Sequence, residues 1–292
     1  VKGEANELAQ DSRGVKIPKS TKTQSSVVTG GFENFLGIRY EVALVSNIVR
    51  GTSVSKEGKY EFFGIGDPSF NGKKSEQSFA FNLFQNNPLR SAISISQLPA
   101  LPETRAEIEA FSKSSIFSKS TLLTGWEATK KNLLDDQKLR SASVISFATH
   151  GLANGQMSEY SLPGLALTPG APSKSEDNGF LSMMDVLGME IVAELVILSA
   201  CETGSARSIH SPPFSGLAAS FLASGAQNVL ASLWPVYSDA TTKLMVSIGK
   251  NKTKDNSWLN AKKNGIKEFV KGNPEYANPV FWAPFVMYTS VR

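Results

Sequence analysis

Residues 194–204 read ELVILSACETG, an almost continuous apolar run that ends at Cys201 before a short polar turn. A second run, SVISFAT at 143–149, ends in the same way at His150. Uninterrupted apolar runs of this length are typical of strands buried on both faces, because a half-exposed strand alternates polar and apolar side chains. The only cysteine and one of the only two histidines in the chain therefore each follow a predicted buried strand.

Further segments alternate between the patterns of strands and helices along most of the chain. Ser182 is the expected N-cap of the helix at 181–189, and Ser238 or Asp239 that of the helix at 238–250. Buried strands separated by helices predict an α/β fold with a mostly parallel central sheet covered on both faces. The other predicted strands are 38–45, 59–66, 120–125, 227–234 and 280–289, and the other predicted helices are 101–111, 126–139, 215–226 and 257–271.

The carboxyl ends of the predicted strands are the expected place for a functional site, because ligands of open parallel sheets bind there. The strand at 59–66 is followed by Asp67, so three strands end in front of Asp67, His150 and Cys201. If these strands are parallel, their ends share one edge of the sheet. A cysteine nucleophile needs a nearby base or positive field, since the thiolate is the attacking species. An imidazole and a thiol at one edge meet that requirement.

Each of these residues also has a purely structural interpretation. A lone cysteine after an apolar run is often an inert buried residue, and a lone histidine is often a polar residue in a turn. Both lie at strand ends, however, and His150 precedes Cys201 by 51 residues, close to the spacing of about 50 in caspases. The caspase motif itself differs, since this cysteine stands in SACETG. His210 competes with His150, but its loop is rich in Ser and Pro and would hold it poorly.

Composition and charge limit the classes of protein to which the chain can belong. The chain has 292 residues, of which 41% are hydrophobic and 19% charged, as expected for a globular fold of one large or two small domains. The net charge of +4 is scattered, so nucleic acid is not expected as a partner. Residues 208–238 lack charge but contain prolines and a polar break, so no membrane span is expected. One cysteine and no signal-peptide core give no sign of an oxidising compartment, and we expect a cytoplasmic protein.

Two boundaries follow from the polarity of the first residues. Residues 1–30 are rich in Ser, Thr and Lys, and we expect a disordered leader or the remainder of a truncated upstream region there. Residues 31–292 are expected to form the folded domain.

Common cofactor sites are not indicated. Two histidines and one cysteine make a zinc site improbable, GIGDPS at 64–69 lacks the third glycine of a dinucleotide-binding loop, and neither a P-loop nor a G-x-S-x-G motif occurs. No metal and no cofactor are therefore expected.

FATHG at 147–151 and LSACETG at 198–204 together resemble a known family. Further segments between residues 36 and 290, among them GIGDPSF, LLTGWEATKKNLL and NPVFWAPFVMYTS, occur in the family's order. The chain resembles the CHAT domains, caspase-related cysteine peptidase domains of clan CD that commonly follow tetratricopeptide repeats. The resemblance implies a caspase-like three-layer α-β-α sandwich. Two departures are the polar leader, which stands where the family usually has further strands, and Ser215, which stands where the family often has an acid.

The resemblance also implies roles for individual residues. Cys201 would attack a peptide carbonyl, and His150 would raise its thiolate fraction or protonate the leaving amine. The backbone N–H groups of Gly151 and Cys201 would form the oxyanion hole. Asp67 would receive a basic substrate side chain, and Glu202 is a weaker candidate for the same pocket. No third residue that would orient the catalytic pair can be named from sequence.

Two functions follow from these expectations. The first is a cysteine endopeptidase acting on protein or peptide substrates, regulated by a tetratricopeptide-type region or an activating partner. The second is a catalytically silent CHAT module that serves as an interaction scaffold. The intact pair of Cys201 and His150 favours the peptidase.

Overall fold

The computed structural model describes residues 8–10, 16–18, 35–49, 60–70, 94–152, 162–170, 177–199, 215–234 and 237–291. Three candidate residues of the sequence, Cys201, Glu202 and His210, lie outside the described residues. Within the described part, none of the helices combines the length and the apolar character needed to cross a bilayer.

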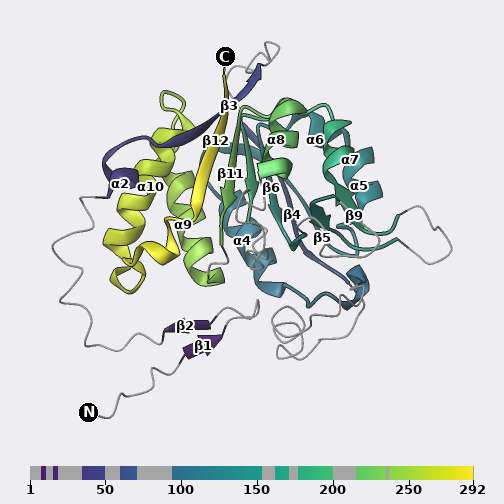
Figure 1. Cartoon of the computed structure of the whole chain (residues 1–292), viewed down its shortest axis with the longest axis horizontal. Helices are drawn as coiled ribbons and strands as arrows, with labels where there is room; N and C mark the ends of the chain where they lie inside the picture. Colours follow the sequence, from purple (N-terminus) through teal and green to yellow (C-terminus); the bar gives the residue numbers. More distant parts are fainter. Residues whose placement is uncertain are drawn as a thin grey trace.

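A seven-stranded sheet forms the centre of the molecule (Figure 1). Its five neighbouring strands from β11 to β5 are parallel, whereas β12 runs antiparallel to β11, and β3 runs parallel to β12. The mostly parallel sheet predicted from the sequence is therefore confirmed. In sheet order the strands are β3 (Ala43–Val49), β12 (Phe285–Val291), β11 (Asn228–Ser232), β10 (Leu195–Leu198), β6 (Val144–Ala148), β4 (Tyr60–Pro68) and β5 (Phe117–Gly125).

Helices cover both faces of the sheet, so the architecture is the expected α-β-α sandwich (Figure 1). One layer contains α2 (Leu36–Arg39), α4 (Pro102–Ser112), α9 (Ser238–Asn251) and α10 (Trp258–Gly272). The other contains α5 (Lys130–Asp135), α6 (Gln137–Ser141), α7 (Met183–Leu187) and α8 (Ser215–Ala223).

Alternate side chains of the central strands enter the two cores. In β10, Leu195 and Ile197 pack with α9 and α10, whereas Val196 and Leu198 pack with α7 and α8. All four are at most 1% exposed. Burying an aliphatic side chain of this size contributes about 1.5–3 kcal/mol, which is why such strands read as unbroken apolar runs in the sequence.

A second, three-stranded antiparallel sheet follows directly after His150. It consists of β7 (Gly151–Leu152), β8 (Gly164–Ala166) and β9 (Phe180–Ser182). Leu152, Ala166 and Phe180 from these strands form a small core with Phe70 and Ile95. The sequence did not predict this sheet, because two or three residues are too few to show an alternating pattern.

Three expected elements differ from the structure. The strand predicted at 38–45 begins as the single-turn helix α2 and becomes β3 only at Ala43. The helix predicted at 126–139 is divided into α5 and α6 by Asp136, whose side chain accepts from Lys138 N–H and caps the second piece. The strand predicted at 280–289 starts as the 3-10 turn Pro279–Phe281, and β12 begins at Phe285.

The predicted helix caps were right in one case and wrong in the other. Ser182 caps α7 in a capping box with Asp185, as expected. Helix α9 includes both Ser238 and Asp239 in its first turn, and its N-cap is Tyr237, which makes no side-chain capping bond.

Short elements complete the described part of the chain. Within the predicted leader, β1 (Leu8–Gln10) and β2 (Lys16–Pro18) pair antiparallel, while the division at residue 30 stays a prediction. Two further 3-10 turns are Ile95–Gln97 and Pro274–Tyr276.

Candidate active site

The carboxyl ends of β4, β6 and β10 lie side by side. Strand β6 is the middle one: Phe147 lies opposite Leu198 of β10, and Ala148 lies opposite Gly66 of β4, in parallel register. The shared edge predicted for the three strands is thus confirmed. The chain after β10 is described as far as Ser199, whose N–H donates to the Phe147 carbonyl at 3.0 Å.

The imidazole of His150 is buried at this edge, with 1% of the residue exposed. Its Nε2 lies 2.8 Å from the carbonyl oxygen of Pro99. A carbonyl oxygen can only accept, so this contact requires the ring proton on Nε2 and makes Nδ1 the nitrogen that accepts a proton in the neutral ring. The Phe70 ring packs against the imidazole with a centroid separation of 5.5 Å.

The backbone around His150 is held by β8. Ala166 N–H donates to the His150 carbonyl at 2.9 Å, and the Thr149 hydroxyl donates to the Ala166 carbonyl. In an antiparallel pair, hydrogen-bonded and non-hydrogen-bonded residue pairs alternate. Because His150 and Ala166 form a bonded pair, the next pair, Gly151 and Leu165, is of the non-bonded kind. The N–H of Gly151 is therefore directed away from β8, as a donor to a bound group would have to be.

Pro99 is the residue that sequence reasoning missed. It stands between the 3-10 turn Ile95–Gln97 and α4, and its neighbours Leu98 and Leu101 are buried. It acts on His150 through a backbone carbonyl, which every residue type possesses. The sequence therefore contains no signal for this contact.

Asp67 follows the buried part of β4 in an unusual conformation. Among the described residues it is the one non-glycine residue with positive φ, 49°. Its N–H donates to Thr104 Oγ1 at 2.8 Å, and its Oδ2 accepts from Arg105 Nε at 3.1 Å. The carboxylate expected to receive a substrate side chain thus faces an arginine of α4 in the structure. Glu202, the second candidate for this pocket, is among the residues that are not described.

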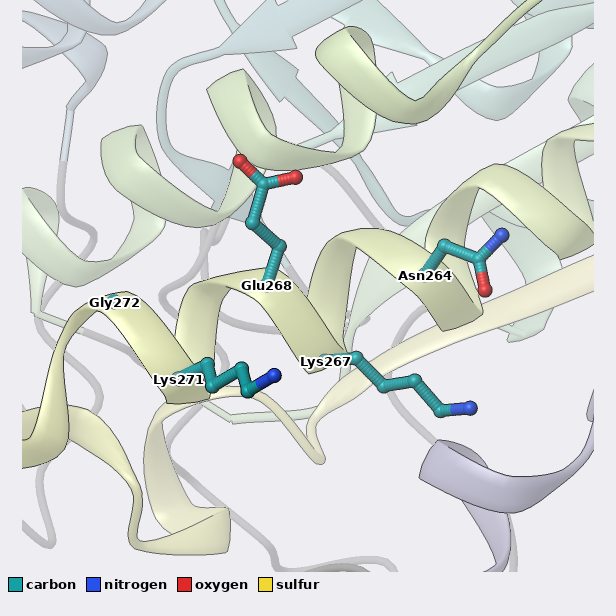
Figure 2. A pocket seen from close by; sticks show the side chains of 5 residues that line it. All are labelled: Asn264, Lys267, Glu268, Lys271 and Gly272. Atoms are coloured by element: carbon teal, nitrogen blue, oxygen red, sulfur yellow. The ribbon is translucent and has the colours of Figure 1, made fainter.

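A shallow depression of about 500 Å³ lies on α10, away from the sheet edge that holds His150 (Figure 2). Figure 2 shows Lys267 and Lys271 on one side of the helix and Glu268 extending from another. Glu268 accepts from Asn251 Nδ2 at 2.6 Å, which ties it to α9. The depression shares no residue with the edge that holds His150, and we assign no function to it. Asn264 and Gly272 complete its lining.

The CHAT domain family matches residues 19–290, so the chain belongs to the CHAT domain family, as its motifs predicted. Tetratricopeptide repeat protein 28 of Mus musculus and that of Homo sapiens are each 26% identical to it over 223 residues. The aligned region is 65% of this chain but only 9% and 8% of those proteins, so the chain spans less than a tenth of the curated relatives it matches.

Two solved structures are similar to this chain at low sequence identity. The Arg-specific cysteine proteinase gingipain R is 9% identical with a TM-score of 0.40, covering 78% of this chain and 46% of its own. The complex of the RgpB pro- and mature domains of Porphyromonas gingivalis is 10% identical with a TM-score of 0.44, covering 78% and 47%. These scores are low, so nothing that these proteins bind or cleave is carried over to this chain.

Proposed function

We propose that the chain is a cysteine endopeptidase in which Cys201 is the nucleophile and His150 the general acid–base. The observation that supports this most directly is the hydrogen bond between His150 Nε2 and the Pro99 carbonyl. An imidazole that is buried at a sheet edge and held in one tautomer is prepared for proton transfer at its other nitrogen. The carbonyl of Pro99 supplies the orienting group of the proposed pair.

The strand register supports the pairing of the two residues. Phe147 and Leu198 lie opposite each other in neighbouring strands, and His150 and Cys201 each follow one of them by three residues. Neighbouring strands are about 4.8 Å apart. One residue, Ala200, lies between the described Ser199 and Cys201, so the Cα atoms of Ser199 and Cys201 are at most about 7.6 Å apart. The imidazole and the thiol therefore belong to one edge of the sheet in this proposal.

The proposed reaction has two halves. The Cys201 thiolate attacks the scissile carbonyl carbon, and a proton passes from the His150 imidazolium to the amine as the C–N bond breaks and a thioester remains. Water then loses a proton to His150 and attacks the thioester, which releases the carboxyl product and the thiolate. The N–H of Gly151 and that of Cys201 would donate to the oxyanion in both halves.

The substrate pocket and the wider context belong to the same proposal. Asp67, with Glu202 as a weaker second acid, would receive a basic side chain of a protein or peptide substrate. Because the curated relatives are named for tetratricopeptide repeats and are far longer, we propose that a region of that type or an activating partner regulates the domain. We place it in the cytoplasm, where a thiol nucleophile stays reduced. We assign the domain itself to residues 31–292, with residues 1–30 as a leader or the remainder of an upstream region.

The single thiol allows a clean test. Alkylation of the 292-residue chain by iodoacetamide reports Cys201 alone, and we expect an apparent thiol pKa well below the free value of about 8.5. Substituting His150→Ala should return the thiol to ordinary reactivity, while the matched variant His210→Ala should not. Peptide cleavage by the wild type that is lost in Cys201→Ala would support Cys201 as the nucleophile. Ordinary thiol reactivity together with no cleavage would favour the silent scaffold module instead.

A further inference from the structure

Asp67 is held rigidly by the first turn of α4. Its φ of 49° is sparsely populated for a residue with a side chain, and such a conformation persists only where the surroundings impose it. Thr104 imposes it here, because its hydroxyl donates to the Leu101 carbonyl at 2.7 Å and accepts from Asp67 N–H at 2.8 Å. The backbone of Asp67 is therefore held in place before any ligand arrives.

The contact between Arg105 and this carboxylate is weak for an arginine. Only Nε of Arg105 donates to Oδ2 of Asp67, at 3.1 Å, although a guanidinium can donate two parallel hydrogen bonds to one carboxylate. Among the described residues, Oδ1 of Asp67 has no hydrogen-bond partner. The side chains of Arg105 and Asp67 are 44% and 23% exposed, and ion pairs as exposed as this one contribute little.

This ion pair lies at the same edge of the sheet as His150. Gly66, the residue before Asp67, is opposite Ala148 in β6, two residues before His150. Phe70, three residues after Asp67, packs on the imidazole itself. Arg105 also reaches the end of β5, because its Nη2 would lie 3.5 Å from a Cβ added at Gly125, the last residue of that strand.

We propose that Arg105 is an internal competitor that occupies Asp67 in the place of a basic substrate side chain and so restrains cleavage after arginine or lysine. The inference rests on the proposed peptidase function and on the proposed role of Asp67. A substrate guanidinium could form the bidentate pair that Arg105 does not form, and would displace it. Removing Arg105 leaves the Asp67 carboxylate open and takes away the need for displacement.

Four peptides that differ only in the residue before the scissile bond test this inference. With Arg or Lys at that position, we expect Arg105→Gln to raise kcat/KM about two- to fivefold, through a lower KM, which is the range of an exposed ion pair. Peptides with Ala or Leu should be cut at the wild-type rate. The same change at an exposed arginine of α6, Arg140→Gln, is the matched control and should alter none of the four.

The outcomes separate the two levels of the proposal. An unchanged or lower kcat/KM for the Arg and Lys peptides, with the Ala peptide still cut, overturns the role of Arg105 and leaves the peptidase intact. No Cys201-dependent cleavage of any of the four peptides contradicts the peptidase, and the inference with it. If Arg105→Gln does not fold, ethylguanidinium provides a second measurement. It should inhibit cleavage of the Arg peptide by the wild-type chain and leave the Ala peptide unaffected, and inhibition of both alike overturns the inference.

Discussion

The Nε2 atom of His150 lies 2.8 Å from the carbonyl oxygen of Pro99, and this contact fixes which imidazole nitrogen holds the proton. The residue is 1% exposed, so water does not compete for the donor. A buried N–H that loses its acceptor costs about 1–3 kcal/mol, which is enough to hold the ring in one tautomer. Pro99 thereby contributes to the site without any side-chain chemistry.

Histidine NMR can check this tautomer directly. In the neutral form we expect the proton of His150 on Nε2, with Nδ1 unprotonated, because the Pro99 carbonyl requires a donor. The chain has only two histidines, so the variant His210→Ala leaves the signals of His150 alone. A neutral ring with its proton on Nδ1 would contradict the geometry and remove the main support for the proposed acid–base role.

The strands at the site were predictable because their physics is local. Runs such as Val144–Ala148 and Leu195–Leu198 are buried on both faces, so every position is apolar and the pattern is visible without knowledge of the partners. Helix α2 was not predictable in this way. It is a single turn that is stabilised by distant residues: Ile38 lies in the core formed with Trp282, and the Phe35 ring meets Trp282 at 5.6 Å.

Within the site, residue types were predictable but pairings were not. His150 stands out because histidine is rare in this chain and follows a buried strand. Its partner is a backbone carbonyl 51 residues away, and Asp67 meets Arg105 across 38 residues. Both contacts depend on where α4 begins relative to β4, which is a tertiary relationship. Cys201 as nucleophile stays a prediction.

Lys262 is expected to make stability depend on pH. It is 9% exposed, and burial lowers its pKa from 10.5 to about 8. Between these values the unfolded chain binds a proton that the folded chain lacks, so the free energy of unfolding should rise as pH increases from about 8 to 10.5. Lys262→Met should remove this rise and stabilise the protein at pH 7 by up to about 3 kcal/mol.

Urea unfolding of the wild type and of Lys262→Met at pH 7 and pH 9.5 measures this effect. The difference between the two proteins should be about 2 kcal/mol smaller at pH 9.5 than at pH 7. Comparing the two proteins at each pH cancels the titration of all other groups. Lys267→Met, at an exposed lysine of the same helix, is the matched control and should show no such trend. Equal differences at both pH values would show that Lys262 keeps its ordinary pKa.

Gly265 of α10 lies directly against the backbone of α9. A Cβ at this position would lie 2.7 Å from Ile248 Cα and 2.8 Å from Ile248 N, so backbone rather than a flexible side chain stands in the way. Gly265→Ala should therefore separate the helices and cost more than about 2 kcal/mol. Gly272→Ala, at a position of the same helix with nothing within 4 Å, should be neutral or slightly stabilising. Thermal melts of the two variants that coincide would mean that the helix pair adapts freely.

Tyr60 connects a buried polar cluster at the amino ends of the strands, opposite the edge that holds His150. Its hydroxyl accepts from Lys252 Nζ at 2.9 Å and donates to Glu194 Oε2 at 3.1 Å. Lys252 Nζ has two further acceptors, the carbonyls of Thr253 and Asn256. Removing one of the three leaves a buried ammonium undersatisfied, so Tyr60→Phe should cost about 1–3 kcal/mol although the ring remains.

Because this cluster lies far from the edge that holds His150, its loss should affect stability and not the reactivity of the site. Tyr60→Phe should lower the urea midpoint, yet leave the reactivity of Cys201 toward iodoacetamide unchanged at temperatures where the variant is folded. Tyr276→Phe is the matched control, because its hydroxyl donates to Asp239 at the surface and its loss should cost less than about 1 kcal/mol. A change in thiol reactivity in Tyr60→Phe would mean that the two edges of the sheet are coupled, which the rigid packing of β4 and β6 between them does not predict.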